Sequence, residues 1–134
     1  MMIEAPSLLI TDDDAAFRET LQGVFEPQGF RTLLAGDGEE ALKIVRTEVV
    51  HLVLLDMHMP KLTGLETLRQ VKRFKSRLPC ILLSARVDDS LILQAQSAEA
   101  FSVLSKPISR HQLTSTVDAA MRRIYGWPSP NEPG

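Results

Sequence analysis

The segment His51–Asp56 reads HLVLLD, a run of apolar residues that ends in one carboxylate. A short apolar run of this kind is typical of a central strand in a parallel sheet, because helices cover both faces of such a strand. A strand at His51–Leu55 would present Asp56 at its carboxyl end. The segment Met57–Thr63 contains a proline and is expected to form the loop that follows.

Apolar runs of the same kind alternate with helical patterns on both sides of this strand. The other runs expected to form strands are Ser7–Thr11, Arg31–Ala35, Cys80–Ser84 and Phe101–Leu104. Each run is followed by apolar residues at helical spacing, and the clearest stripe is Leu113, Val117, Met121 and Ile124. This alternation predicts an α/β fold in which helices cover both faces of a parallel sheet.

The composition fits one compact domain. The chain has 134 residues, of which 44% are hydrophobic and 24% charged. We expect the domain to occupy residues 1–125. Residues 126–134 hold three of the eight prolines and show no apolar period, so they are expected to form a disordered tail or the start of a linker.

Charge, cysteine content and hydropathy exclude several classes of protein. A net charge of −2 without an evident Lys/Arg cluster argues against direct binding of nucleic acid. No apolar run approaches the roughly 18 residues that a membrane-spanning helix needs, and the single cysteine, Cys80, cannot form an internal disulfide. Since the N-terminus lacks an export signal, we expect a cytoplasmic protein with no membrane contact.

Acidic residues follow two of the predicted strands. Asp12, Asp13 and Asp14 come directly after the first strand, and Asp56 comes after the third. In an open α/β sheet, ligands bind outside the carboxyl ends of the strands. Several carboxylates meeting there would attract a hard divalent cation with oxygen ligands, and Mg²⁺ is the natural candidate.

Lys106 and Ser84 follow the fifth and fourth predicted strands at the same edge. A solvent-facing carboxylate such as Asp56 can attack an activated phosphorus when a metal ion and an ammonium group offset the transferred charge. Taken singly, an aspartate can be a helix cap and Lys106 a surface lysine. Their joint placement at successive strand ends favours a site for phosphoryl chemistry.

The motifs LLITDDD, LVLLDMHMPKLTG, ILLSA and VLSKP, in this order and spacing, resemble those of response-regulator receiver domains. The resemblance covers Leu8 to Ile124. It implies a flavodoxin-like, doubly wound sheet of five parallel strands in the order 2-1-3-4-5, with five helices.

The resemblance also implies roles for residues after the first and third strands. Asp56 would be the phosphoacceptor, Asp13 a direct metal ligand, and Asp12 a partner that holds the metal through water. The backbone carbonyl of His58 would complete the ligand set. Asp14 would cap the first helix instead of binding metal.

Residues after the fourth and fifth strands complete the implied site. Lys106 would pair with the carboxylate or phosphoryl group, preceding a cis peptide bond to Pro107. Ser84 would turn toward a bound phosphoryl group. His58 and Arg86 stand at positions that tune phosphoryl hydrolysis in this family, although both could equally be solvated surface residues.

One position departs from the family pattern. Val103 stands three residues before the lysine, where receivers usually carry an aromatic ring or a histidine that turns inward on activation. Phe101 is expected to point to the same face as Val103 by strand periodicity. A readout through a rotating ring is therefore in doubt.

The resemblance indicates a phosphoacceptor domain of a two-component response regulator, which takes its phosphoryl group from a sensor histidine kinase or a phosphotransfer protein. Such a domain is consumed and regenerated, so it is not a turnover enzyme. We expect the new charge to shift the Asp88–Ser97 helix and the fifth strand. Together with the last helix, they would form a face for a partner or a homodimer.

Three alternatives use a similar pattern. A haloacid-dehalogenase-type phosphatase would need an acid where His58 stands, and a flavodoxin-like FMN carrier would need a phosphate cradle where Asp12–Asp14 would repel it. A degenerate receiver could act as a dimerisation or docking module without phosphorylation. Val103 favours this last alternative, whereas the intact aspartates, Ser84 and Lys106 argue against it.

Overall fold

A computed structural model describes residues 5–127, in which five strands and five α-helices alternate along the chain. The strands are β1 (Ser7–Thr11), β2 (Arg31–Ala35), β3 (Leu52–Asp56), β4 (Cys80–Ser84) and β5 (Ser102–Ser105). The helices are α1 (Ala15–Phe25), α2 (Gly38–Thr47), α3 (Gly64–Phe74), α4 (Asp89–Ser97) and α5 (Arg110–Tyr125). A short 3-10 helix at Glu26–Gln28 follows α1.

The strands form one parallel sheet in the order β2-β1-β3-β4-β5, so the predicted doubly wound fold is confirmed. Every residue of β1, β3 and β4 is buried, as expected for central strands covered on both faces. Because β1 and β3 are neighbours, the residues that follow them lie at the same edge of the sheet.

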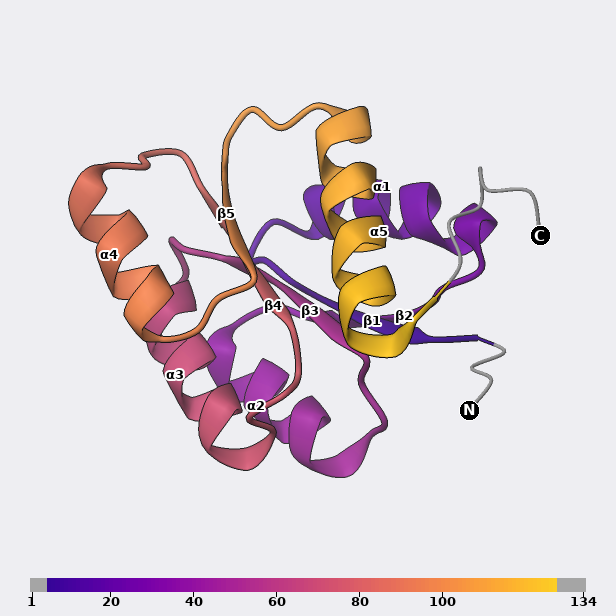
Figure 1. Ribbon diagram of the computed structural model, residues 1–134, viewed down its shortest axis with the longest axis horizontal. Coiled ribbons are helices and arrows are strands. Elements are labelled where there is room, and N and C mark those ends of the chain that lie inside the picture. Colours follow the sequence, from indigo (N-terminus) through magenta and orange to yellow (C-terminus); the bar gives the residue numbers. More distant parts are fainter. Residues whose placement is uncertain (1–4, 128–134) are drawn as a thin grey trace.

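Two layers of helices enclose the sheet: α1 and α5 cover one face, and α2, α3 and α4 lie on the other (Figure 1). Side chains alternate between the two cores along each strand. In β1, Leu8 and Ile10 pack toward α1 and α5, whereas Leu9 packs toward α2 and α3. Burying each such side chain contributes about 2 kcal/mol to folding. This burial on both faces holds the strand in a single orientation.

Each helix begins at a side chain that accepts a hydrogen bond from the backbone of its first turn. These N-cap residues are Asp14, Asp37, Thr63, Asp88 and Ser109. The role predicted for Asp14 is confirmed, since its carboxylate accepts from the amides of Ala16 and Phe17. Caps of this type contribute about 1 kcal/mol each, and they set where each loop at the carboxyl edge ends.

The structure corrects the prediction that Phe101 and Val103 share a face. Phe101 packs with the core beneath α1 and α5, whereas Val103 packs with the opposite core. The physical reason is that β5 begins at Ser102, so Phe101 precedes the strand and does not follow its alternation. Similarly, β3 begins at Leu52, one residue later than expected.

The predicted tail begins where α5 ends. Gly126 adopts a left-handed conformation (φ +67°) and caps the helix, and the ring of Trp127 lies 6.5 Å from that of Phe30. Residues 128–134 lie outside the described part of the chain. None of the helices within residues 5–127 is long and apolar enough to cross a membrane.

Candidate functional site

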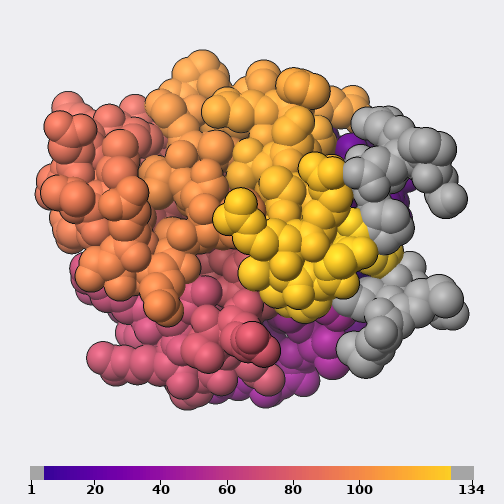
Figure 2. Space-filling model, viewed as in Figure 1, coloured from indigo at the N-terminus to yellow at the C-terminus, as the bar shows by residue number. Residues whose placement is uncertain are grey.

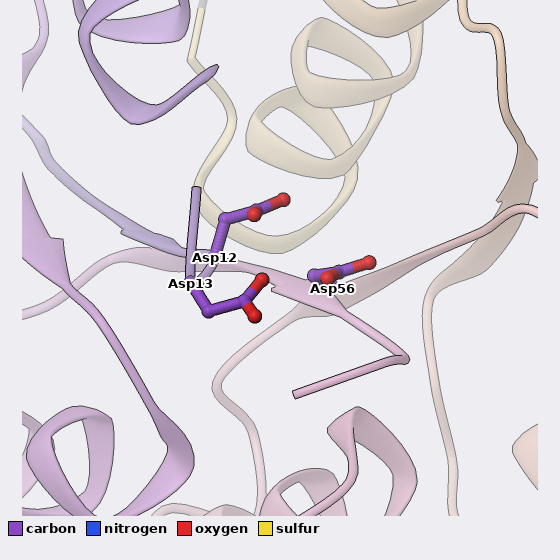
Figure 3. A group of neighbouring side chains, drawn as sticks. All are labelled: Asp12, Asp13 and Asp56. Carbon is purple, nitrogen blue, oxygen red and sulfur yellow. The ribbon is translucent and has the colours of Figure 1, made fainter. Parts of the chain in front are cut away.

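Three carboxylates meet at the carboxyl ends of β1 and β3. Asp56 is the last residue of β3, and Asp12 and Asp13 directly follow β1. One oxygen from each lies within 4.8 Å of the other two, and Figure 3 shows the three side chains facing the same region. Asp12 and Asp56 are only 3% and 4% exposed, whereas Asp13 is exposed to solvent. The site is therefore anchored in the core and open on one side.

Lys106 brings a positive charge to these carboxylates from the end of β5. Its Nζ lies 3.0 Å from Oδ1 of Asp56 and 3.4 Å from Oδ2 of Asp12. The backbone amide of Lys106 donates to the carbonyl of Ser84 at 2.8 Å, which ties the lysine to β4. The predicted cis bond between Lys106 and Pro107 is present.

The pKa values of Asp12 and Lys106 are both raised above their ordinary values. Burial raises the pKa of Asp12, the backbone amide of Asp14 opposes that shift, and the negative charge of Asp56 adds to it. For Lys106, burial lowers the pKa, but the hydrogen bond and charge of Asp56, together with Asp12, outweigh burial and raise it. Lys106 thus stays a charged partner for the carboxylates.

Ser84 lies fully buried at the end of β4, and its hydroxyl is engaged with the backbone of Arg86. Its Oγ donates to the Arg86 carbonyl at 3.0 Å and accepts from the Arg86 amide at 3.2 Å. The Nε2 atom of His58 lies 3.5 Å from the same Oγ. The Ser84 hydroxyl is therefore already engaged, and an incoming acceptor would have to replace the Arg86 carbonyl as its hydrogen-bond partner.

The structure brings together most of the residues that the sequence analysis selected. Asp12, Asp13, Asp56 and Lys106 form one cluster, with Ser84 and His58 beside each other at the same edge. Arg86 contacts the site through its backbone. Val103 is instead partly buried and packs against the core under α2, α3 and α4.

Three residues near the site were missed by the sequence analysis. The ring of Phe17 lies 4.9 Å from Nζ of Lys106, and Nη1 of Arg18 donates to the Asp12 carbonyl at 2.6 Å. Gly64, the first residue of α3, packs directly against the backbone of Asp56. No sequence signal separates Phe17 from other core positions of an amphipathic helix, because its role depends on how α1 meets β5.

The donor set fits a divalent cation. Hard cations such as Mg²⁺ bind carboxylate oxygens, and three carboxyl groups here face one ammonium group, which leaves an excess of negative charge. The side chains available to hold an ion are those of Asp12, Asp13 and Asp56.

The sheet and site define a doubly wound α/β domain with an acidic cluster at the carboxyl edge of its sheet, and comparison with known proteins identifies the family. The response regulator receiver domain family matches residues 8–118, so the chain belongs to that family. The transcriptional regulatory protein AfsQ1 of Streptomyces coelicolor is 36% identical over 118 residues, which are 88% of this chain and 52% of AfsQ1. The chain thus spans about half the length of this relative.

Solved structures agree with this assignment. The receiver domain of the Francisella response regulator 1452 has a TM-score of 0.82 and 29% identity, and the match covers 88% of this chain and 98% of that one. A CheY-like receiver domain protein from Methanospirillum hungatei has a TM-score of 0.87 at 20% identity, over 91% and 98% of the two chains, which supports the fold alone. The chain is a receiver domain of the two-component type.

Proposed function

We propose that this receiver accepts a phosphoryl group on Asp56 from a sensor histidine kinase or a phosphotransfer protein. The observation that carries the proposal is the contact of Lys106 Nζ with Asp56 Oδ1 at 3.0 Å, beside the carboxylates of Asp12 and Asp13. An acceptor oxygen, a fixed ammonium group and a cation-binding pair of carboxylates are the parts that phosphoryl transfer requires.

The proposed step conserves atoms and charge. A carboxylate oxygen of Asp56 attacks phosphorus, forms a new P–O bond, and displaces the donor's histidine nitrogen or, with a small donor, its carboxylate. Lys106 would keep its position and pair with a phosphoryl oxygen. Water later attacks the phosphorus and releases phosphate, restoring Asp56. Because the chain is substrate in the first reaction and is regenerated in the second, it would act as a switch and not as a turnover enzyme.

Mg²⁺ held by Asp12, Asp13, Asp56 and the backbone carbonyl of His58 would offset the charge of the phosphoryl oxygens. The chain's own residues would then respond to the phosphoryl group on Asp56. Ser84 would exchange its bonds with the Arg86 backbone for one to a phosphoryl oxygen. His58, 3.5 Å from the Ser84 hydroxyl, stands where it would affect how long the phosphoryl group survives.

The output would be a change in the surface formed by α4, β5 and α5, which could bind a partner or a second copy of the chain. Only Leu91 and Ala95 of α4 are buried, and Leu93 is 65% exposed. Such a weakly anchored helix can move at low energetic cost. Since Val103 has no ring to rotate, the movement would be transmitted by Ser84 and the α4 backbone.

Intact mass measurement tests the acceptor assignment. The chain is incubated with acetyl phosphate and Mg²⁺, alongside Asp56→Ala, an EDTA-treated sample, and Asp14→Asn as a matched control. Asp14 lies beside the cluster but serves as a helix cap, which asparagine preserves. We expect one added phosphoryl group in the native chain and in Asp14→Asn, and none in the other two samples.

A native chain that gains no mass under these conditions would favour the alternative function, a docking module that works without phosphorylation. The conformational part of the proposal has a separate test. Backbone amide NMR spectra with and without a phosphate mimic should differ along α4 and β5, and identical spectra would contradict it.

A further inference from the structure

A groove of about 980 Å³ lies at the end of the sheet opposite to the carboxylate site. Its walls are the last turns of α3 and α5, and its floor includes Val50, Pro79 and Phe101, which lead into β3, β4 and β5. Figure 2 shows the face on which the end of α5, in yellow, approaches the turn after α4, in orange, and the end of α3, in rose. We call this region the basic groove.

Four cationic side chains and one acidic side chain, Glu99, line the basic groove. The cationic residues are Lys72, Lys75, Arg77 and Arg123. Lys72 is already engaged, because its Nζ donates to the carbonyls of Ser76 at 3.2 Å and Leu78 at 2.8 Å, near the end of α3.

The other three cations lack an acidic partner within the described residues. No carboxylate of residues 5–127 forms an ion pair with Lys75, Arg77 or Arg123. The sequence analysis found no Lys/Arg cluster, and that was wrong, because residues 72–77 read KRFKSR. The overall charge of −2 conceals a molecule that is acidic at one end of its sheet and basic at the other.

Two aromatic rings that line the groove, those of Phe74 and Phe101, each have an arginine over them. Phe74 is 47% exposed, and Cζ of Arg46 lies 4.4 Å from its ring centroid. Cζ of Arg123 lies 5.4 Å from the ring centroid of Phe101. A guanidinium group stacked on a ring is held in place while its N–H donors remain available to a carboxylate. Exposed apolar side chains beside fixed arginines are also typical of protein interfaces.

We propose that the basic groove is a docking site for an acidic segment of a partner protein, in which Asp or Glu residues flank a bulky apolar side chain. The carboxylates would pair with Lys75, Arg77 and Arg123. The apolar side chain would cover Ile124, which is 42% exposed, and the part of Phe74 that Arg46 leaves uncovered.

Other occupants fit this groove less well. A symmetric dimer in which two basic grooves face each other is opposed by charge. A nucleic acid offers phosphates but would need open rings for its bases, and an arginine already lies over both Phe74 and Phe101. The docking site is separate from Asp56 and does not depend on phosphorylation.

Peptide selection on the full chain tests this inference. A random twelve-residue display library is selected on the immobilised protein, and enriched peptides are synthesised and measured by fluorescence anisotropy. We expect enrichment of acidic residues next to Leu, Phe or Trp. Affinity should fall at least tenfold in the double variant Lys75→Glu, Arg77→Glu.

The matched control is Lys43→Glu, Arg110→Glu, which changes two exposed cations outside the groove and alters net charge equally. Its affinity should stay within twofold of the native value. In the intact-mass assay, both double variants should accept a phosphoryl group on Asp56 as the native chain does. Loss of peptide binding can therefore be distinguished from loss of the proposed function.

Three outcomes would overturn the docking site. The first is a selection that enriches no acidic sequences. The second is equal weakening in both double variants, since that would indicate a diffuse charge effect and no defined groove. The third is a single-stranded oligothymidylate that binds as tightly as the peptides with the same dependence on Lys75 and Arg77, because the groove would then be a nucleic-acid site.

Discussion

Replacing Gly64 with alanine should damage the site through the backbone of the phosphoacceptor. A Cβ at this position would meet the carbonyl oxygen of Asp56 and would lie 2.9 Å from both its carbonyl carbon and Cα of Met57. Ordinary contacts between such atoms are about 3.5–4.0 Å, so the β3–α3 connection must move by roughly 1 Å. These neighbours are backbone atoms and cannot turn aside as a side chain would.

The expected cost follows from this overlap. Insertion of a methyl group into a packed region destabilises by about 1–3 kcal/mol. With a urea m-value of about 1.5 kcal/mol/M, the urea midpoint should fall by roughly 0.7–2 M. Displacement of the Asp56 backbone should also slow phosphorylation by acetyl phosphate at least tenfold, because transfer depends on alignment of the acceptor.

Gly23→Ala is the matched control. Gly23 lies within α1, and an added Cβ there meets nothing within 4 Å. Alanine should therefore stabilise the fold by about 0.5–1 kcal/mol. Urea denaturation followed by circular dichroism and the intact-mass time course measure both effects. A Gly64→Ala variant with native stability and native phosphorylation rate would refute the steric argument.

Further predictions concern Phe17, His51 and Cys80. Phe17→Leu removes the ring 4.9 Å from Lys106 Nζ, and a loss of about 0.5–1 kcal/mol should slow acetyl-phosphate transfer roughly two- to fivefold, whereas an unchanged rate would exclude a positioning role. Burial lowers the pKa of His51, whose Nδ1 accepts from the Ser7 amide. As the pH falls, His51 therefore takes up a proton in the unfolded chain before it does so in the folded one. The contribution of His51 to the free energy of unfolding should be fully present above its ordinary pKa of 6.5 and should fall at more acidic pH. The urea midpoint should therefore be lower at pH 5.5 than at pH 8, and His51→Gln should reduce this difference. Burial raises the pKa of Cys80 to about 12, so thiol reagents at pH 8 should modify it in the unfolded chain and leave it intact in the folded one, and rapid labelling of the native protein would contradict its burial.

The architecture was predictable because local patterns determined it. Apolar runs of five residues, helical stripes and capping side chains such as Asp14 agree with one another along the chain. Their strict alternation leaves few arrangements other than a parallel sheet between helices. The strand order and the roles at Asp56, by contrast, came from motif resemblance, since no local pattern states which strands are neighbours.

Features that depend on packing between distant segments were not predictable. The alternation rule failed for Phe101 because the first residue of β5 is decided by pairing with β4. Gly64 acquires its importance from the close approach of α3 to the end of β3. The basic groove arises because the ends of α3 and α5 come together although Lys75 and Arg123 lie far apart in sequence.

The sequence by itself determined the strands and helices, the sheet's burial and the set of residues at its carboxyl edge, because propensity, periodicity and capping act over a few residues. The pair of Lys106 and Asp56 was expected from the motif resemblance. Only the tertiary structure decided the other contacts, of Phe17 with Lys106 and of Arg123 with Phe101. Such contacts depend on how helices settle against a twisted sheet, and that is set by the packing of the whole core.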